Sequence, residues 1–267
     1  MTNFKDRLLD ENKENLTQYD KLKLKTNFKR FLEISAYDFN KQIIKKNIGN
    51  ELRTFHILDQ SKPLISPSRL SSLFNEHLFW NIPKKTLLIP RLLGQLVHKF
   101  LELRLVYNEI IKLNLENLEE YCKGDYLLIK ENWSQEKILI FIDEVNEAVD
   151  NIYNYLSRKG IKIIAAEKYV CNNNFHGFID LVGLKTYVNS REKIPMIIDL
   201  KITSNDEIIN TYYVQLSLYR EIYERTANCY ILFYNRDRKT PRLEKASWAK
   251  LNETYEIIEK LNNLYRD

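Results

Sequence analysis

The sequence predicts a mixed α/β protein, and three observations support this fold class. Only six of the 267 residues are glycine and six are proline, a composition that favours long helices over a loop-rich all-β chain. Apolar residues recur at helical spacing through much of the first 160 residues. Residues 161–202 instead divide into three short runs rich in isoleucine and valine, as expected for consecutive strands.

The first 60 residues are charged, rich in lysine, asparagine and glutamate, and are predicted to be helical. In the segment KLKLKTNFKRFLEI (21–34), lysines surround apolar residues that gather near one helix face: Leu22, Leu24, Phe28, Phe31 and Leu32. The simpler interpretation is a solvated helix packed on a core. The alternative is a basic arm that contacts a nucleic-acid backbone.

Three more helices are expected before the strands. The turn signal QSKPLISPSRLSS (60–72) precedes the first of them, and Ser66 or Ser68 is placed to cap it. The second follows Pro90 as an amphipathic run over residues 91–113, and the third covers residues 139–158.

The strands come next, with one helix between the third and the fourth. The predicted strands are residues 161–170, 175–185, 194–202 and 228–235, with a fifth around 242–248. The predicted helices are residues 206–225 and about 249–265. After residue 160 the order is therefore β-β-β-α-β. This order predicts a mixed central sheet flanked by helices, preceded by a helical N-terminal elaboration.

Composition and charge narrow the class of protein. The net charge of +5 and the pI of about 8.8 permit a phosphate-rich partner without requiring one. The three scattered cysteines, Cys122, Cys171 and Cys229, form no CxxC pair, which argues against a zinc finger or a disulfide framework. The N-terminus lacks a signal-peptide apolar run, and no apolar run approaches the roughly 20 residues of a membrane span. We expect a soluble intracellular protein in a reducing compartment, with no membrane partner.

Two acidic residues and a lysine lie in apolar strands. Asp199 and Lys201 share one face of their predicted strand, because side chains alternate along a strand. Removing such charges from water is costly unless they pair or bind a metal. The preceding strand carries Asp180 within GFIDLVG. Carboxylates on adjacent strands can converge on one divalent cation, and oxygen ligands suit Mg²⁺ or Mn²⁺. The plainer alternative is that both aspartates cap turns or pair with lysines.

Two helices carry further candidate residues. Gly94, His98 and Glu102 recur every four residues and so share one helix stripe. Glycine would permit close approach of the helix, His98 would offer a nitrogen ligand, and Glu102 would bond the other ring nitrogen or lie at the pocket edge. Gln215 and Tyr219 likewise share a face of the helix after Lys201. A histidine satisfied within the core, and half-buried packing of the glutamine and tyrosine, are the alternatives.

Taken together and in this order, these residues resemble the RecB-type branch of the PD-(D/E)XK nucleases. The stretch ISPSRLSSLFNEHLFW (65–80) also resembles a segment found near the start of such modules, so the resemblance covers roughly residues 65–235. It implies a nuclease domain over 65–267, with its motifs at about 90–235, preceded by a helical extension over 1–64.

The resemblance also implies roles for individual residues. His98, Asp180, Asp199 and the carbonyl of Leu200 would hold Mg²⁺ or Mn²⁺, and Asp180, Asp199 and Lys201 would be catalytic. The resemblance gives Gln215 and Tyr219 contacts with the DNA backbone, and Glu167 matches an acidic position found in many relatives. The residues His56, His77 and His176 are assigned to structure, although His176 is close enough in sequence to Asp180 to approach the site.

One departure from the family concerns iron. Several relatives hold a four-iron cluster on one early and three late cysteines. Here the early position reads Asn75-Glu76-His77, and only Cys229 lies late. We expect no iron–sulfur cluster.

The implied activity is metal-dependent hydrolysis of DNA, by an exonuclease or an end- or single-strand-acting nuclease in DNA repair, recombination or replication. A helicase or recombination protein would be its partner. We expect DNA with a free end or single-stranded stretch, because residues 1–160 could close over a strand path and tyrosines could stack on bases. One alternative is an inactive nucleic-acid-binding or complex-organising module with the same fold, against which the complete acid-acid-lysine set argues. An RNA-directed nuclease is the other.

Overall fold

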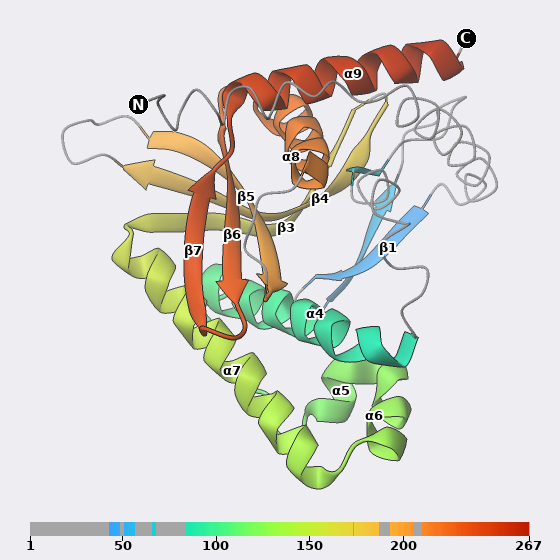
Figure 1. Ribbon diagram of the computed structural model, residues 1–267, viewed down its shortest axis with the longest axis vertical. Helices are drawn as coiled ribbons and strands as arrows, with labels where there is room; N and C mark the ends of the chain where they lie inside the picture. Colours follow the sequence, from blue (N-terminus) through green and yellow to red (C-terminus); the bar gives the residue numbers. More distant parts are fainter. Residues whose placement is uncertain are drawn as a thin grey trace, which may run out of the picture.

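The computed structural model describes residues 43–48, 51–56, 66–67, 84–172, 174–186, 193–204 and 210–266 (Figure 1). These residues form a mixed α/β fold, as the sequence predicts. The helices are α4 (Lys84–Val106), α5 (Leu118–Cys122), α6 (Tyr126–Asn132), α7 (Gln135–Arg158), α8 (Asn210–Tyr223) and α9 (Trp248–Arg266), with a 3₁₀ turn, Lys123–Asp125, before α6. The main strands are β3 (Ile161–Cys171), β4 (His176–Thr186), β5 (Lys193–Thr203), β6 (Asn228–Asn235) and β7 (Thr240–Lys245).

The five main strands form one mixed sheet in the order β3-β4-β5-β6-β7. Neighbouring strands are antiparallel except β5 and β6, which run parallel and are connected through α8. A parallel pair requires such a crossover, because the chain must return to the starting edge of the sheet. The predicted succession of strands and helices along the chain after residue 160 is confirmed, with boundaries that differ by at most a few residues.

The helices cover both faces of the sheet (Figure 1). One core lies between the sheet and α4 to α7, and Ile198, Leu200 and Leu232 point into it. The other lies between the sheet and α8 and α9, and Ile197 and Ile231 point into that one. Strand alternation sends successive residues of β5 to opposite cores, so both faces must be apolar.

Helix α4 begins earlier than the sequence predicts. Its first residue is Lys84, so Pro90 lies inside the helix rather than before it. Proline removes one main-chain hydrogen bond there. Leu88 before the proline and Leu92 and Leu93 after it are all buried in one core, and this packing offsets the loss.

The prediction of helix through the first 60 residues is wrong over two ranges. β1 (Ile43–Ile48) and β2 (Glu51–His56) form a two-stranded antiparallel hairpin, in which Ile48 pairs with Glu51. The sequence between them, Gly49-Asn50, is a pair typical of two-residue hairpin loops, a signal that the charged composition obscured. The remainder of the predicted extension, and residues 68–80 with Ser68 and His77, lie outside the described residues. Within the described part of the chain, no helix is long and apolar enough to cross a membrane.

Candidate functional site

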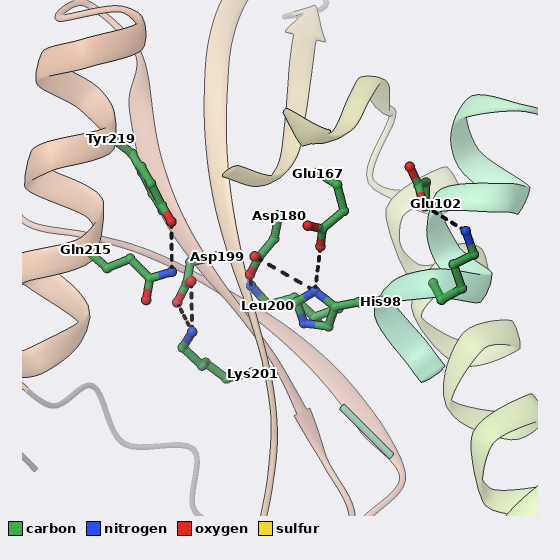
Figure 2. A network of polar contacts seen from close by, with 10 residues as sticks. His98, Glu102, Glu167, Asp180, Asp199, Leu200, Lys201, Gln215 and Tyr219 are labelled. Carbon is green, nitrogen blue, oxygen red and sulfur yellow. Dashed lines mark hydrogen bonds and ion pairs between the residues drawn. The ribbon is translucent and has the colours of Figure 1, made fainter. Parts of the chain in front are cut away.

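Three side chains that can serve as metal ligands come from three different elements and meet beside β3 and β4, at one edge of the sheet (Figure 2). His98 comes from α4, Glu167 from β3 and Asp180 from β4, and one ligand atom from each lies within 4.8 Å of the others. The Nδ1 atom of His98 is 3.4 Å from a Glu167 carboxylate oxygen and 3.8 Å from an Asp180 oxygen. All three side chains are partly buried, with 24%, 15% and 13% of their surfaces exposed. This is a donor set that a divalent cation can share.

The backbone is irregular at Glu167 in β3 and near Asp180 in β4. Glu167 and Asp180 lie opposite each other, because their neighbours are register partners: Ala166 with Leu181 and Lys168 with Ile179. The φ angle of Glu167 is 49°, in the left-handed region that side chains other than glycine rarely adopt. In β4, Ile179 and Val182 both pack in the α8-side core, although regular alternation would place residues three apart on opposite faces. The two carboxylates therefore face each other where both strands depart from regular geometry.

The strained backbone at Glu167 leads to a stability prediction. The free energy of unfolding should be higher for Glu167→Gly than for Glu167→Ala, by roughly 1–2 kcal/mol. The glycine variant is the more stable because only glycine adopts a left-handed φ without a steric penalty. Urea unfolding of both metal-free variants measures the difference. The matched control is the next residue, Lys168, which is exposed and lacks a positive φ. There the glycine variant should be the less stable of the two, and the same order at both positions would contradict the strain.

Asp180 connects this trio to the next strand. The pairing of β4 with β5 runs as far as Leu181 and Ile198. Beyond it, the Asp180 carboxylate accepts a hydrogen bond of 2.8 Å from the main-chain N–H of Leu200. Because the N–H and C=O of an extended residue point to the same side, the Leu200 carbonyl is directed toward the side on which Asp180 lies.

Asp199 and Lys201 form an ion pair on the face of β5 toward α8, in which the aspartate is buried and 25% of the lysine side chain is exposed. The Lys201 ammonium lies 2.8 Å from one carboxylate oxygen of Asp199 and 2.7 Å from the other. Only 2% of Asp199 is exposed. Burial raises the pKa of Asp199 to about 6; the Lys201 charge opposes this rise and the Asp180 charge adds to it. The alternative considered from sequence, in which the aspartates only pair with lysines or cap the backbone, therefore has some support. Asp199 pairs with Lys201, and Asp180 accepts a hydrogen bond from a main-chain N–H.

The imidazole of His98 lies in a field of negative charge. Burial lowers its pKa, but the Asp180 and Glu167 carboxylates raise it more, so the net pKa of His98 is raised. Two carboxylates around one imidazole concentrate charge that either a proton or a divalent cation would neutralise. The residues present therefore fit a metal ion by donor chemistry as well as by spacing.

The side chains of Gln215 and Tyr219 extend from α8 toward Asp180 and Asp199 (Figure 2). The Gln215 amide nitrogen lies 3.5 Å from the Tyr219 hydroxyl, and the two residues are only 8% and 2% exposed. Burial raises the pKa of Tyr219, and the carboxylates of Asp180 and Asp199 raise it further, so the hydroxyl keeps its proton. Neither residue offers an open surface to a polymer. Each can reach only a group that enters the site itself.

Two glycines near the site behave differently. A Cβ atom added to Gly177 would lie 2.8 Å from Cε1 and 3.2 Å from the hydroxyl oxygen of Tyr219, so only glycine lets the tyrosine lie against β4. A Cβ added to Gly94 would meet nothing within 4 Å. The expectation that Gly94 permits close approach of the histidine-bearing helix is therefore wrong. Open space beside α4, rather than a tight contact, surrounds that position.

These two glycines predict opposite effects of the same substitution. Gly177→Ala should lower the free energy of unfolding by roughly 1–3 kcal/mol, because Tyr219 or the strand must move. Gly94→Ala, in the interior of a helix, should leave stability unchanged or raise it by up to about 1 kcal/mol. Chemical denaturation of both variants provides the comparison. Equal destabilisation by both would show that the close contact at Gly177 carries no weight.

Other residues considered from sequence lie elsewhere. Glu102 is 1% exposed and pairs with Lys99 at 3.7 Å, and Figure 2 shows it pointing away from the His98 ring. The expectation that Glu102 orients that ring is therefore wrong, because the helix turns its carboxylate into the core. His176 packs against Tyr169, with ring centroids 6.3 Å apart, which supports a structural role.

Tyr212 was not identified from the sequence as a residue of this site. The ring of Tyr212 lies beneath the Lys201 ammonium, 5.4 Å from ring centroid to nitrogen. Its sequence signal is its position three residues before Gln215, on the same stripe of the helix.

Two known proteins are similar to this chain over most of its length. No family model matches the chain. The chain is similar to "Uncharacterized protein UU146" of Ureaplasma parvum serovar 3, with 27% identity over 237 residues that cover 85% of this chain and 97% of that protein. It is also similar to a crystal structure described as a "Putative exonuclease" from Eubacterium rectale, with 14% identity, a TM-score of 0.42, and coverage of 74% of this chain and 76% of that one.

Proposed function

We propose that this protein is a metal-dependent nuclease that hydrolyses phosphodiester bonds in DNA. One observation carries the proposal: the trio of His98, Glu167 and Asp180 adjoins the buried pair of Asp199 and Lys201. The hydrogen bond from the Leu200 N–H to Asp180 holds the two groups together. A cluster of carboxylates beside a fixed ammonium is suited to a substrate that carries phosphate charge.

The proposed metal ligands are His98, Asp180, Asp199 and the carbonyl of Leu200. Glu167 joins this set, because its carboxylate is closer to the His98 ring than that of Asp180. A nitrogen ligand favours Mn²⁺ over Mg²⁺, which prefers oxygen alone. When bound, the ion would neutralise charge that develops on the phosphate and lower the pKa of a coordinated water.

Lys201 acts in this proposal as a cation and not as a base. Burial lowers the pKa of Lys201, but Asp199 and Asp180 raise it more, and the net pKa is raised above its ordinary value. The ammonium is therefore charged at neutral pH. In this charged form it can donate hydrogen bonds to the attacking water or to a phosphate oxygen.

Gln215 and Tyr219 supply two more donors. Their side chains are buried and directed into the site, so they would bind the oxygens of the phosphate under attack rather than the flanking backbone. Because the tyrosine stays protonated, its hydroxyl remains a donor across the physiological pH range. We further propose membership of the RecB-type branch, and a substrate with a free end or single-stranded stretch.

The cysteines lead to a prediction about iron. Cys122 and Cys229 are buried and Cys171 is exposed, and the three belong to α5, β6 and β3. Protein purified anaerobically should be colourless and contain no stoichiometric iron by elemental analysis, because a four-iron cluster needs four thiolates. Iron near four atoms per chain would refute this.

The test of the proposed function is a cleavage assay on end-labelled DNA. Linear and circular molecules, single- and double-stranded, are incubated with Mg²⁺, Mn²⁺ or chelator, and an RNA oligonucleotide is run in parallel. We expect metal-dependent cleavage that favours ends or single strands. Asp180→Asn, purified in the same way, controls for contaminating nucleases. Failure to cleave any DNA above that control would refute the proposal. Cleavage of RNA alone would show that the substrate is RNA and not DNA.

A further inference from the structure

The Lys201 ammonium lies against two side chains in the described part of the chain. One is the carboxylate of Asp199, at 2.7 and 2.8 Å, and the other is the face of the Tyr212 ring, at 5.4 Å from the centroid. We propose that Tyr212 is a positioning residue that holds Lys201 at the catalytic centre through its ring face. This inference rests on the proposed nuclease function.

The fold gives Tyr212 a defined place. Lys201 on β5 is the register partner of Phe233 on β6, so the two side chains lie next to each other on the face toward α8. The Tyr212 ring packs against Phe233 with centroids 6.1 Å apart and planes inclined by 59°. Phe233 is fully buried, and it therefore fixes one side of the tyrosine ring. The Tyr212 ring is therefore supported by a core residue and not by the lysine alone.

A ring face suits this task better than a second carboxylate. The lysine side chain is a flexible stem with a compact charge at its end, so it needs contacts to fix the position of the ammonium. An aromatic face attracts a cation but offers no ligand to a metal ion. If a metal ion engages Asp199, that carboxylate divides its charge between two cations. The contact with Tyr212 is unaffected by this and still defines where the ammonium lies.

The stripe of α8 that faces the site supports the same assignment. Tyr212, Gln215 and Tyr219 are separated by three and four residues, the spacing of neighbours on one helix face. The last two direct polar groups toward the carboxylates, whereas Tyr212 presents its ring to the ammonium. One helix face would thus contact both the substrate phosphate and the lysine.

The experiment compares Tyr212→Phe, which keeps the ring, with Tyr212→Leu, which removes it. Tyr223→Leu is the matched control, because Tyr223 is a half-buried tyrosine on the same helix that packs against the same core. With DNA substrate and Mn²⁺, we expect kcat within about 2-fold of wild type for Tyr212→Phe and for Tyr223→Leu. We expect a loss of roughly 10-fold in kcat for Tyr212→Leu, with KM and calorimetric Mn²⁺ affinity unchanged.

Two outcomes would overturn the inference. If Tyr212→Phe loses as much activity as Tyr212→Leu, the hydroxyl and not the ring is responsible. If Tyr212→Leu matches Tyr223→Leu, the effect is one of packing alone.

A second measurement does not depend on cleavage. In protein labelled with ¹³C at lysine Cε, the Lys201 resonance, assigned from Lys201→Arg, should show an upfield ring-current shift. That shift should persist in Tyr212→Phe and vanish in Tyr212→Leu. If wild-type protein cleaves nothing, the nuclease proposal fails while the shift still reports the contact. If the shift is absent from wild type, the contact itself is refuted.

Discussion

Lys201→Ala and Asp199→Asn should each reduce metal-dependent cleavage by about 10²–10³-fold, because on the proposed function the first removes the cation that faces the phosphate and the second removes a metal ligand. End-labelled DNA in Mg²⁺ and Mn²⁺ provides the measurement. Binding of uncleaved DNA should change little, since backbone contacts spread over many basic residues dominate affinity. Cleavage at the wild-type rate by either variant would show that the centre has been placed wrongly.

The buried geometry adds a consequence for stability. The Asp199 side chain is 1% exposed and depends on Lys201 for its countercharge. Lys201→Ala should therefore lower the free energy of unfolding by roughly 3–5 kcal/mol. The double variant Asp199→Asn/Lys201→Met, which removes both charges, should be more stable than Lys201→Ala. This pair of variants separates loss of chemistry from loss of folding.

The destabilisation of Lys201→Ala should depend on pH. Burial raises the pKa of Asp199 to about 6 in the folded protein, so this group stabilises the fold at low pH, and that stability is lost as the pH rises through 6. Lys201 opposes this rise in pKa, and its removal enlarges the loss. The difference in unfolding free energy between wild type and Lys201→Ala should be smaller at pH 5 than at pH 8. An equal difference at both values would contradict the buried pair.

His98→Ala should raise the dissociation constant for Mn²⁺ at least about 10-fold, because it removes the nitrogen from a set of three ligand atoms within 4.8 Å. Activity should fall most at limiting Mn²⁺. The metal-free variant should keep most of its stability, since the ring is 24% exposed and lies among carboxylates rather than within the apolar core. Isothermal calorimetry with Mn²⁺ and thermal melts of the metal-free proteins measure both quantities.

Leu101→Ala on the same helix is the matched control for that experiment. Leu101 is fully buried, so its truncation should destabilise the fold by about 2–5 kcal/mol while leaving the Mn²⁺ affinity of folded protein unchanged. The two variants should thus show opposite patterns. If His98→Ala instead lowers the melting temperature steeply at unchanged Mn²⁺ affinity, His98 is a core residue.

The sequence by itself determined the features that depend on neighbouring residues. Strand alternation predicted that Asp199 and Lys201 share a face, and helical spacing predicted the stripe of Gln215 and Tyr219; the structure has both. The order of strands and helices after residue 160 followed from the same periodicities. The charged composition of the first 60 residues was a poorer basis for prediction. It led to a prediction of helix where β1 and β2 form a hairpin.

Only the tertiary structure decided which residues meet across the chain. His98 and Glu167 are 69 residues apart, and their contact depends on how α4 packs against β3. The left-handed φ of Glu167 and the missing steric role of Gly94 have no counterpart in sequence periodicity. Helical spacing places Tyr212 on the same stripe as Gln215, but its ring meets Lys201 only because α8 packs against β5 and β6. Periodicity reports which side of its own element a residue occupies, whereas the packing of elements against each other decides what that side faces.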